Sequence, residues 1–381
     1  MTELVLVVNV GSSSLRCSMT DPTSGRTAAS AHLEDVGGHG PATHADAMDL
    51  ALEQLRANGC DLDSTPPTAI GHRVVHGGPL FREPVLIDDQ VVTALESLQA
   101  LAPLHIPATV ATIRATRRAF PTVPQVAVFD TEFHTSLPQT AYTYAVPLAW
   151  REQFGVRRYG FHGTSFAYVT SRATALLGLT DRGANLILLH LGHGASACAV
   201  ERGRSIDTSM GLTPVEGLVM GTRSGDVDPS LGPYLGRVAG LDSAEFDTEL
   251  TSASGLLALS GTSDWRELEQ LRRDGNARAE LAFDVAVHRI LKYVGAYAVE
   301  LGDVDAIVFT GGVGEHSAAL RAAVLGNLGI LGVELDTGAN DRESADERQV
   351  TAQGSRITAY VIPTHEEREI ARACAALARA G

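Results

Sequence analysis

The stretch that decides the fold is the N-terminal run LVLVVNVGSSSL at 4–15. Its first six residues, LVLVVN at 4–9, form an almost continuous apolar run, which passes into a glycine- and serine-rich turn and resumes at Leu15. A continuous apolar run of this length is typical of a strand buried on both faces, and glycine with serine is typical of a tight turn. The stretch therefore predicts a buried strand, a tight polar turn and a second strand.

The same pattern returns half a chain later. LILLHL at 186–191 is a second apolar run, and it ends in GHGASAC at 192–198. At an offset of 181 residues (190 − 9), Asn9 aligns with His190, Gly11 with Gly192 and Cys17 with Cys198. Two units of strand, glycine turn and strand at this spacing predict a duplicated α/β domain, with one phosphate-binding turn from each copy.

Two further strands are expected in the C-terminal half. AIVF in DAIVFTGGVGEH at 305–316 leads into a glycine-rich turn, and apolar residues at helical spacing precede it at 281–301. ITAYVIPTHEE at 357–367 is a strand ended by Pro363, and the alanine-rich stretch at 366–380 is helical. Open α/β sheets bind ligands beyond the carboxyl ends of their strands, so we expect these turns to converge on one cleft.

The composition fits an ordinary globular enzyme. The 381 residues are 44% hydrophobic and 20% charged, and this length favours two domains. A formal net charge of −15 argues against a nucleic-acid or membrane-surface partner. The four cysteines show no CxxC spacing, which argues against a zinc site or a disulfide framework. The N-terminal run is too short and too acidic in its flank for a signal peptide, so we expect a cytoplasmic protein.

One polar loop carries a strong chemical signal. GTRSGDVDPS at 221–230 sets Arg223 among glycine and serine, with Asp226 and Asp228 close behind. Arginine binds planar anionic groups through a rigid fork of donors, and aspartate attracts hard cations. These are the groups that phosphoryl transfer needs, because that reaction depends mostly on positioning and charge neutralisation.

Two strands end in further charged residues. GHRVVHGG at 71–78 places Arg73 in an apolar strand, where a buried guanidinium needs an anion or a carboxylate. The alternative is an edge strand with Arg73 in solvent. VAVFDTEFH at 126–134 is a buried strand that ends on Asp130, a position typical both of catalytic acids and of helix caps.

Histidines stand in two other turns. His105 lies in LAPLHIPATV at 101–110, just ahead of an expected helix, and a lone histidine there is usually structural. His162 is bracketed by two glycines in RRYGFHGTSF at 157–166, where Thr164 and Ser165 are able to cap the following helix. A capped helix start explains the threonine and the serine but not a histidine between glycines.

Other reaction classes explain less of the sequence. No GxSxG occurs for a serine hydrolase, and THEER at 364–368 lacks the second histidine of HExxH. No GxxxxGK[ST] occurs either, so NVGSSSL at 9–15 is a phosphate cradle of another kind or an ordinary turn. Phosphoryl transfer accounts for more of the polar loops than a hydrolase does.

In this order, the loops resemble the acetate kinase family, within the wider group of acetate and sugar kinases, actin and heat-shock ATPases. The matching stretches are NVGSSSL, GHRVVHGG, LAPLH, VFDTEFH, RRYGFHGTS, HLGHGAS, TSMGLTPVEGLVMGTRSGDVDPS, FTGGVGEHS and VIPTHEE. The resemblance implies reversible transfer of the γ-phosphoryl group of ATP to a short carboxylate, with Mg²⁺ or Mn²⁺, giving an acyl phosphate and ADP. It also implies a homodimer.

For the fold, the resemblance implies two duplicated ribonuclease-H-like α/β domains of the actin-like ATPase type around a central cleft. The N-terminal domain would comprise residues 1–133 with 368–381. Residues 134–367 would form the C-terminal nucleotide-binding and dimerisation domain.

The resemblance also implies roles for individual residues. Arg73 and Arg223 would stabilise the transferring phosphoryl group, His162 would donate to its oxygens, and Asp130 would lie beside the acceptor and the metal ion. Asn9 and Glu366 would hold the metal ion. The nucleotide and its phosphates would contact Asn9, Ser12, Ser14, Arg16, His190, Gly192, His193, Gly194, Gly311, Gly312, Gly314, Glu315 and His316. A pocket for a methyl or ethyl group would comprise Val75, Leu104, His105, Phe161 and Pro214.

Several positions depart from the family pattern. Arg16 replaces a lysine, Ile106 an asparagine and Phe166 a histidine, and three asparagines have become His193, His316 and His365. A histidine keeps a donor and an acceptor but is larger and titrates near neutral pH. We therefore expect a changed donor or acceptor preference, or a changed pH optimum, unless these substitutions are neutral.

Two alternatives remain at this point. One is a kinase of the same fold that acts on another small carboxylate or uses another donor, such as pyrophosphate. The other is a catalytically weak nucleotide- or acyl-phosphate-binding protein. The complete set of Arg73, Asp130, His162, Arg223 and Glu366 favours an enzyme, because binding alone does not need it.

Overall fold

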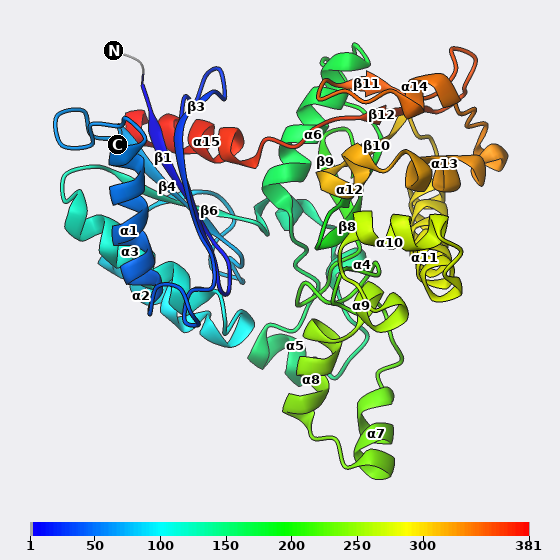
Figure 1. Ribbon diagram of the computed structural model, residues 1–381, viewed down its shortest axis with the longest axis horizontal. Helices are drawn as coiled ribbons and strands as arrows, with labels where there is room; N and C mark the ends of the chain where they lie inside the picture. Colours follow the sequence, from blue (N-terminus) through cyan, green and yellow to red (C-terminus); the bar gives the residue numbers. More distant parts are fainter. Residues whose placement is uncertain (1–2, 381) are drawn as a thin grey trace. The chain divides into compact units, whose positions relative to one another are not determined.

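The computed structural model describes residues 3–380, which form two compact units (Figure 1). Of the described residues, the first unit contains 3–135, 161–168 and 365–380, and the second contains Ser136–Gly160 and Val169–Thr364. Each unit is built on its own six-stranded sheet with helices packed against it. The domain boundaries expected above, after residues 133 and 367, stay a prediction.

The first unit begins with an antiparallel meander and continues with parallel strands. Its elements are β1 (Val5–Val10), β2 (Leu15–Thr20), β3 (Thr27–Leu33), α1 (His44–Ala57), β4 (Ala69–Val74), β5 (Val85–Leu86), α2 (Asp89–Ser97), η1 (Gln99–Leu101), α3 (Ile106–Ala119), β6 (Gln125–Phe129), η2 (Glu132–Ser136) and α15 (Glu366–Ala380). The strand order is β3-β2-β1-β4-β6-β5. Helix α6 (Gly163–Leu176) starts in this unit and continues into the second.

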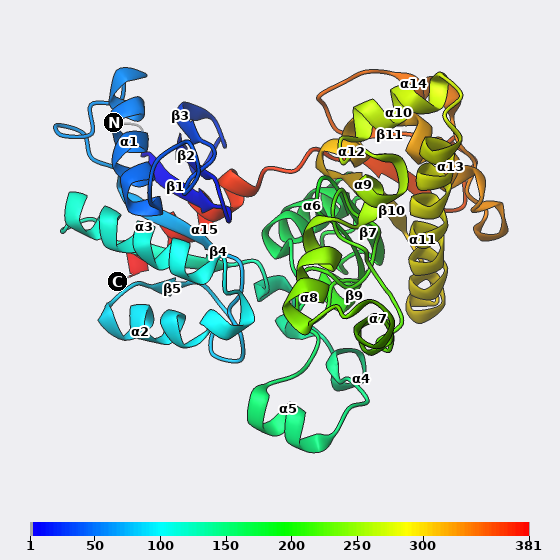
Figure 2. The ribbon, with the colours of Figure 1, turned by 60° about the horizontal axis from the view of Figure 1, so that its bottom comes forward.

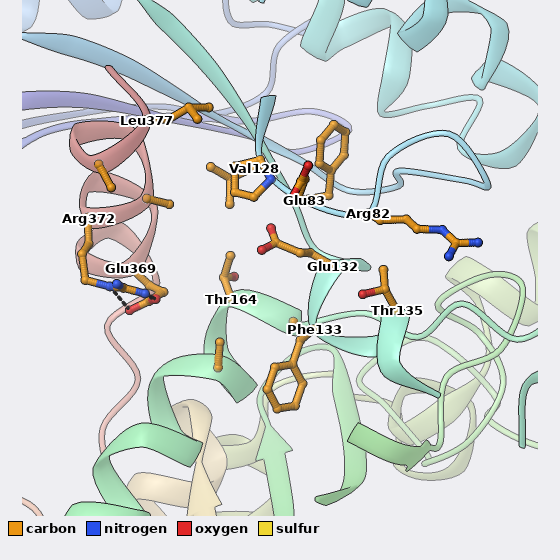
Figure 3. Close-up of a pocket in the computed structure, with 16 residues that line it drawn as sticks. Arg82, Glu83, Val128, Glu132, Phe133, Thr135, Thr164, Glu369, Arg372 and Leu377 are labelled. Atoms are coloured by element: carbon orange, nitrogen blue, oxygen red, sulfur yellow. Dashed lines mark hydrogen bonds and ion pairs between the residues drawn. The ribbon is translucent and has the colours of Figure 1, made fainter. Parts of the chain in front are cut away.

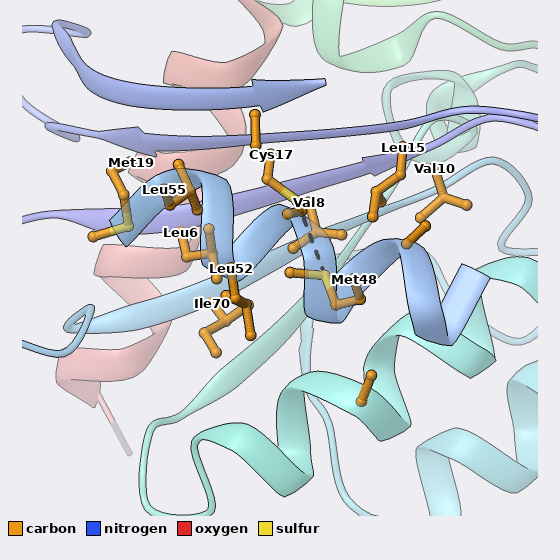
Figure 4. Close-up of a cluster of buried hydrophobic side chains, with 14 of the residues drawn as sticks. Leu6, Val8, Val10, Leu15, Cys17, Met19, Met48, Leu52, Leu55 and Ile70 are labelled. Carbon is orange, nitrogen blue, oxygen red and sulfur yellow. Dashed lines mark hydrogen bonds between the residues drawn. The ribbon is translucent and has the colours of Figure 1, made fainter. Parts of the chain in front are cut away.

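Both faces of the first sheet are covered, which explains the unbroken apolar run of β1. Leu6 and Val8 pack in a core with α1 and α3 (Figure 4). Val5 and Val7 point to the opposite face and pack against α15. A strand buried on both faces needs apolar residues at every position rather than at alternate ones. The N-terminal run therefore forms the centre of the unit.

The second unit follows the same plan with longer insertions. Its elements are α4 (Gln139–Tyr142), α5 (Leu148–Phe154), β7 (Leu186–Leu191), β8 (Ala195–Glu201), β9 (Arg204–Thr208), α7 (Leu231–Ala239), α8 (Ser243–Ser252), α9 (Gly255–Ser260), α10 (Trp265–Arg273), α11 (Ala277–Leu301), β10 (Ala306–Thr310), α12 (Gly311–His316), α13 (Ala318–Gly326), η3 (Gly329–Leu331), α14 (Thr337–Asp341), β11 (Arg348–Gln349) and β12 (Thr358–Val361). Helices α9 and α10 lie beside α11 (Figure 2), and the three helices share one apolar cluster.

The two sheets have the same topology, and this confirms the predicted duplication. The order of the second sheet, β11-β12-β10-β7-β8-β9, matches that of the first when β7 is laid on β1. In both, the first three strands pair antiparallel, the next two are parallel to the first, and a short antiparallel strand closes the edge. Each copy therefore presents a strand–turn–strand unit at an equivalent position.

The alignment of the two copies at an offset of 181 residues is wrong beyond the turn that follows the first strand of each copy. The turn between β1 and β2 contains residues 11–14, whereas that between β7 and β8 contains only 192–194. The turn of the second copy is therefore one residue shorter than that of the first. As a result, Cys17 corresponds in register to Ala197 rather than to Cys198. The match between the two cysteines in the sequence is a coincidence.

Other expectations about local structure are met with small changes. Arg73 lies on β4, which has neighbours on both sides, so the edge-strand alternative is wrong. The long helix expected at 281–301 begins earlier, at Ala277. The glycine-rich stretch after β10 forms the short helix α12 instead of a turn. In residues 3–380 no helix is long and apolar enough to cross a membrane.

Candidate functional site

The first group of predicted site residues lies on three neighbouring strands of the first unit. Asn9 on β1 is in register with Arg16 on β2 and with Arg73 on β4. Residues in register on adjacent strands share a face of the sheet, so these side chains form a row near the carboxyl end of β1. Arg16 is exposed, whereas Arg73 is partly buried. Sheet pairing thus gathers residues that are 64 positions apart.

Arg73 joins the predicted acids into one network. Its Nε donates to Asp130 Oδ1 at 2.9 Å, its Nη1 donates to Asn9 Oδ1 at 2.9 Å, and Glu366 Oε2 lies 3.8 Å from its Nε. Asp130 follows β6 and is almost completely buried, and Glu366 is the first residue of α15. Burial alone would lower the pKa of Arg73, but Asp130 and Glu366 more than offset this and raise it.

The network has more negative than positive charge. Arg73 pairs at short range with Asp130, which leaves Glu366 without full compensation. Burial raises the pKa of Glu366 to about 7, with a further contribution from the charge of Asp130 and against the attraction of Arg73. A buried carboxylate of this kind attracts a cation, and carboxylate and amide oxygens are the donors that Mg²⁺ prefers. Glu366 and Asn9 therefore fit a magnesium ion, which usually takes only one or two carboxylates.

No larger metal centre accompanies this network. Among residues 3–380, no three His, Cys, Asp or Glu side chains are grouped so that they could hold a metal ion. All four cysteines are free.

His162 has an unusual backbone conformation next to Asp130. Its φ of 58° lies in the left-handed region, which few residues other than glycine adopt. The next residue, Gly163, donates its N–H to Asp130 O at 2.8 Å, and a Cβ on Gly163 would stand 2.3 Å from that oxygen. The glycine is thus required for this close approach. Such strain is frequent at functional sites, where it fixes a side chain in one direction.

The helix that follows is not capped as expected. Helix α6 begins at Gly163, and the hydroxyl of Thr164 is buried with no hydrogen-bond partner among the described residues. Thr164 therefore does not act as the N-cap. The sequence pattern was misleading because the close contact of Gly163 with Asp130 starts the helix one residue before the threonine.

The predicted acyl-pocket residues differ in their exposure. Val75 and Phe161 are buried, with 9% and 2% of their surface exposed, whereas Leu104 is 69% exposed. The ring of Phe161 stands edge-on to His76 with centroids 5.3 Å apart. His105 immediately precedes α3, and Pro214 belongs to the second unit. Within the first unit, Val75 and Phe161 have the packing of a preformed apolar wall, and Leu104 does not.

The two glycine turns differ in the polar groups that they expose. In the first unit Gly11 N donates to Ser14 O at 2.8 Å, and Ser12 at the tip of the turn is exposed. In the second unit Gly192 N donates to Gly194 O at 3.0 Å. The first turn therefore offers hydroxyl groups, while the second offers mainly backbone.

A second group of predicted residues gathers beside the β7–β8 turn. Gly311 has a φ of 75°, and a Cβ there would stand 2.7 Å from Leu191 O, so only glycine lets α12 approach the end of β7. A cavity of about 660 Å³ lies here and is lined by Gly192, His193, Gly312 and His316. Its size suits a small organic ligand.

Part of this cavity was not predicted from the sequence. Leu256 on α9, together with Ser263, Asp264, Trp265, Arg266 and Glu269 around the start of α10, forms another wall. Trp265 Nε1 donates to Glu269 Oε1 at 3.0 Å, which fixes the indole ring. Trp265 is one of only two tryptophans in the chain, and this scarcity is the one signal that could have drawn attention to it. Glu315 lies outside this lining and accepts from Thr364 N at 3.1 Å.

Arg223 in the second unit has no acidic partner. Its Nη1 donates to Pro214 O at 3.2 Å, and no Asp or Glu of residues 3–380 lies within ion-pair distance of it. Burial lowers its pKa because no carboxylate stabilises the charged form. A partly buried guanidinium without a counter-charge is available to bind an anion.

The two aspartates of the same loop have structural contacts. Asp226 Oδ1 accepts from Gly217 N at 2.8 Å, Asp226 Oδ2 accepts from Tyr293 OH at 3.0 Å, and Arg289 Nη1 lies 3.2 Å from Oδ2. Asp228 Oδ1 accepts from Ser230 N at 2.8 Å. These bonds hold the loop that carries Arg223, so the aspartates serve its shape.

Two of the three unusual histidines share the second-unit cavity. His193 and His316 both line it, and the ring of His193 lies so close to Gly221 that a Cβ there would stand 2.7 Å from it. His365 belongs to the first unit, where its ring stands edge-on to Tyr168 with centroids 5.3 Å apart. The three substitutions therefore fall into two separate environments.

Comparison with known proteins gives one consistent result. A model of the acetokinase family matches residues 4–372. Proteins named acetate kinase from Streptomyces avermitilis and Leifsonia xyli are each 48% identical, over 98% and 97% of this chain and 97% of their own lengths. Solved structures of an acetate kinase from Porphyromonas gingivalis and a propionate kinase from Francisella tularensis superpose with TM-scores of 0.93 and 0.92, at 39% and 37% identity, over 98% of this chain and 99% of theirs.

Proposed function

This chain belongs to the acetokinase family and is a kinase, and on this basis we propose that it transfers the γ-phosphoryl group of ATP reversibly to acetate. The products are acetyl phosphate and ADP. Propionate is the next acceptor, because a solved relative at 37% identity is named a propionate kinase. We further propose a cytoplasmic homodimer that binds a small carboxylate and a nucleotide.

The observation that carries the proposal is that the guanidinium of Arg223 has no acidic partner among the described residues. A guanidinium that is partly buried and has no acidic partner is costly to keep unless an anion binds to it. In phosphoryl transfer the transferring group spreads negative charge over its oxygens, and an arginine placed there accelerates the reaction greatly. Arg223 supplies this charge, and Asp226 keeps its loop in place.

The residues of the first unit act on the acceptor and on the same phosphoryl group. An acetate carboxylate is ionised at neutral pH, with a pKa near that of a glutamate at about 4.3, so it needs no general base. The obstacle is repulsion between two anions, which Arg73 reduces while Asp130 and Asn9 hold its guanidinium in place. His162 donates to a phosphoryl oxygen from its fixed backbone position.

Glu366 and Asn9 are the residues that would hold Mg²⁺, which supplies charge neutralisation for the phosphate oxygens when bound. The buried carboxyl of Glu366 is suited to this, because a cation would favour its ionised form. Asp130 remains paired with Arg73. Mn²⁺ prefers the same oxygen donors and would be expected to substitute for Mg²⁺.

We assign the nucleotide to the cavity beside the β7–β8 turn. Gly192 and Gly312 expose backbone there, and His193 and His316 add side-chain donors. The acyl group is assigned to Val75 and Phe161, the two buried apolar residues of the predicted pocket in the first unit, which suit a methyl or ethyl group.

A hydroxamate-trapping assay tests this proposal. Acetate, propionate, butyrate and formate are each combined with ATP, GTP and pyrophosphate, with Mg²⁺ and without it. We expect acyl phosphate from acetate and ATP, less from propionate, and almost none without Mg²⁺. Absence of acyl phosphate with every pair would refute the proposal.

The same grid tests a second candidate, in which the donor is pyrophosphate or another nucleotide. Two observations favour it: His193 and His316 both line the proposed nucleotide cavity, and both replace asparagines of the family pattern. Product with pyrophosphate but not with ATP would establish this alternative and exclude the first.

A further inference from the structure

A second cavity lies in the first unit and has no role in the proposed reaction. Its volume is about 570 Å³, and it is enclosed by the end of β6, the start of η2, the first turns of α6, the helix α15 and the loop before β5 (Figure 3). None of the predicted catalytic or nucleotide-binding residues lines it. A space of this size accommodates a small organic molecule.

One acidic side chain in this cavity has no counter-charge. Glu132, the first residue of η2, points into the cavity and forms no hydrogen bond or ion pair with any described residue (Figure 3). Arg372 on α15 is engaged with Glu369, its Nε donating to Glu369 Oε1 at 3.1 Å. Arg82 directs its guanidinium away from Glu132. Neither arginine of the lining therefore forms an ion pair with Glu132, and Arg372 offsets its charge only in part.

A buried hydroxyl points to a ligand at the same place. Thr164 on α6 is only 5% exposed, its Oγ1 has no hydrogen-bond partner in residues 3–380, and it lines the cavity. In Figure 3 the side chains of Thr164 and Glu132 lie on facing sides of the same space. Buried polar groups are normally satisfied, so an unpartnered hydroxyl beside an unpartnered carboxylate indicates a missing donor.

The charge and the walls define the ligand. Glu83 is a further carboxylate without an ion-pair partner, and Arg82, which also has none among the described residues, turns its guanidinium away from Glu132 (Figure 3), so the charge that faces Glu132 is negative and calls for a cation. No three acidic or histidine side chains of the described chain are grouped for a metal ion, which argues for an organic cation. Val128 and, on α15, Ala373 and Leu377 provide an apolar surface for an aliphatic body.

We propose that this cavity binds a small alkylammonium ion, with its charged head between Glu132 and Thr164 and its aliphatic body against Val128 and α15. The ammonium N–H groups donate to the carboxylate and to the hydroxyl, and so satisfy both. The walls connect directly to the proposed active-site segments, because Glu132 follows Asp130 by two residues and Thr164 follows His162 by two.

The site has a built-in dependence on pH. Burial raises the pKa of Glu132 to about 7, with smaller contributions from the charges of Glu369 and Glu83 and an opposing one from Arg372. An alkylammonium keeps its charge throughout this range, since amines of this type titrate near pH 10. Affinity should therefore rise by roughly tenfold between pH 6 and pH 8, as Glu132 ionises.

Calorimetric titration of the full-length protein with n-butylammonium chloride at pH 8 tests the site, with 1-butanol as the uncharged analogue. We expect saturable binding of one butylammonium per chain and binding of butanol that is weaker by roughly tenfold or more. Glu132→Gln should weaken butylammonium binding by roughly tenfold or more and abolish its pH dependence. Thr164→Val should weaken it severalfold, and Glu53→Gln on the exposed face of α1 should leave it unchanged.

Three results would overturn the proposal. These are no saturable butylammonium binding at millimolar concentration, equal affinity for butanol, or unchanged affinity in Glu132→Gln. Glu132→Gln removes an unpaired charge and Thr164→Val removes an unpartnered hydroxyl, so both variants should keep the thermal midpoint of the parent protein at pH 8 or raise it. The test does not depend on the kinase reaction, because its readout is binding alone.

Discussion

Replacement of Arg223 by alanine should separate catalysis from stability. We expect kcat to fall by roughly 10³-fold or more, on the scale of a lost arginine finger. The same scale follows from electrostatics, because two unit charges about 4 Å apart at an effective dielectric constant of about 20 attract each other by about 4 kcal/mol. At about 1.36 kcal/mol for each factor of ten, this corresponds to about 10³-fold.

Stability should change little in the same variant. Arg223 forms one hydrogen bond to a backbone oxygen, at 3.2 Å, and has no ion pair that its loss would break. Removal of a partly buried charge without a partner offsets the loss of that bond, so we expect the free energy of unfolding to stay within about 1 kcal/mol of the parent value.

The assay is acetyl phosphate formation at saturating acetate and ATP, together with urea denaturation of the same preparations. Arg237→Ala, on an exposed turn of α7, is the matched control and should change neither quantity. Arg223→Lys keeps the charge but loses the planar fork, so its kcat should lie between those of the parent and the alanine variant. A loss of less than tenfold in Arg223→Ala, or a stability loss large enough to unfold the chain, would refute the role assigned to this residue.

Three further predictions concern other parts of the structure. Arg73→Ala should lower both kcat and the free energy of unfolding, the latter by about 3 kcal/mol in urea denaturation, because it leaves Asp130 buried without its partner. Glu132 has a pKa raised to about 7 in the folded chain, so it should stabilise the fold at low pH and lose that contribution as pH rises from about 5 to 7. In thermal melts, the free energy of unfolding should fall between pH 5 and pH 7 by on the order of 1 kcal/mol less in Glu132→Gln than in the parent protein. The difference is no larger because Glu132 keeps some contact with water. His193→Asn combined with His316→Asn should change the KM for the nucleotide but not for acetate, whereas equal changes in both would contradict their place in the nucleotide cavity.

The sheet strands could be predicted because a buried strand appears in the sequence as a run of apolar residues. β1 and β7 are covered on both faces, so every position is apolar except one near the end of each strand, Asn9 in β1 and His190 in β7. The one-residue difference between the two turns could not be predicted in the same way. Both turns consist of small polar residues, and nothing in such a composition specifies how many residues the turn needs.

The charged residues of the site could be predicted for a similar reason. Arg73 and Asp130 stand at positions where apolar strands end, and a charge in such a place is conspicuous. The wall of the proposed nucleotide cavity at 256–269 was missed, because the turn at Gly261 between α9 and α10 resembles an ordinary connection between helices. Glu132 and Thr164 were missed as a pair, since only the contact of Gly163, at the start of α6, with Asp130, the residue after β6, brings them to one cavity.

The duplication gives the two units the same sheet topology, but their charged residues differ. In the first unit Asn9 has an arginine in register on each side, and one of these is held by Asp130. In the second unit the equivalent position of β7 is His190, whose partner on β8 is a serine, so the repeated strands carry no arginine there. The cation of the second unit comes instead from the loop of Arg223, outside the duplicated strands. An arginine that forms ion pairs within the protein contributes to folding as well as to binding. An arginine without such partners contributes mainly to binding. Substitutions at Arg73 and Arg223 should therefore be similar in kcat and differ in stability, although both side chains are proposed to act on the same phosphoryl group.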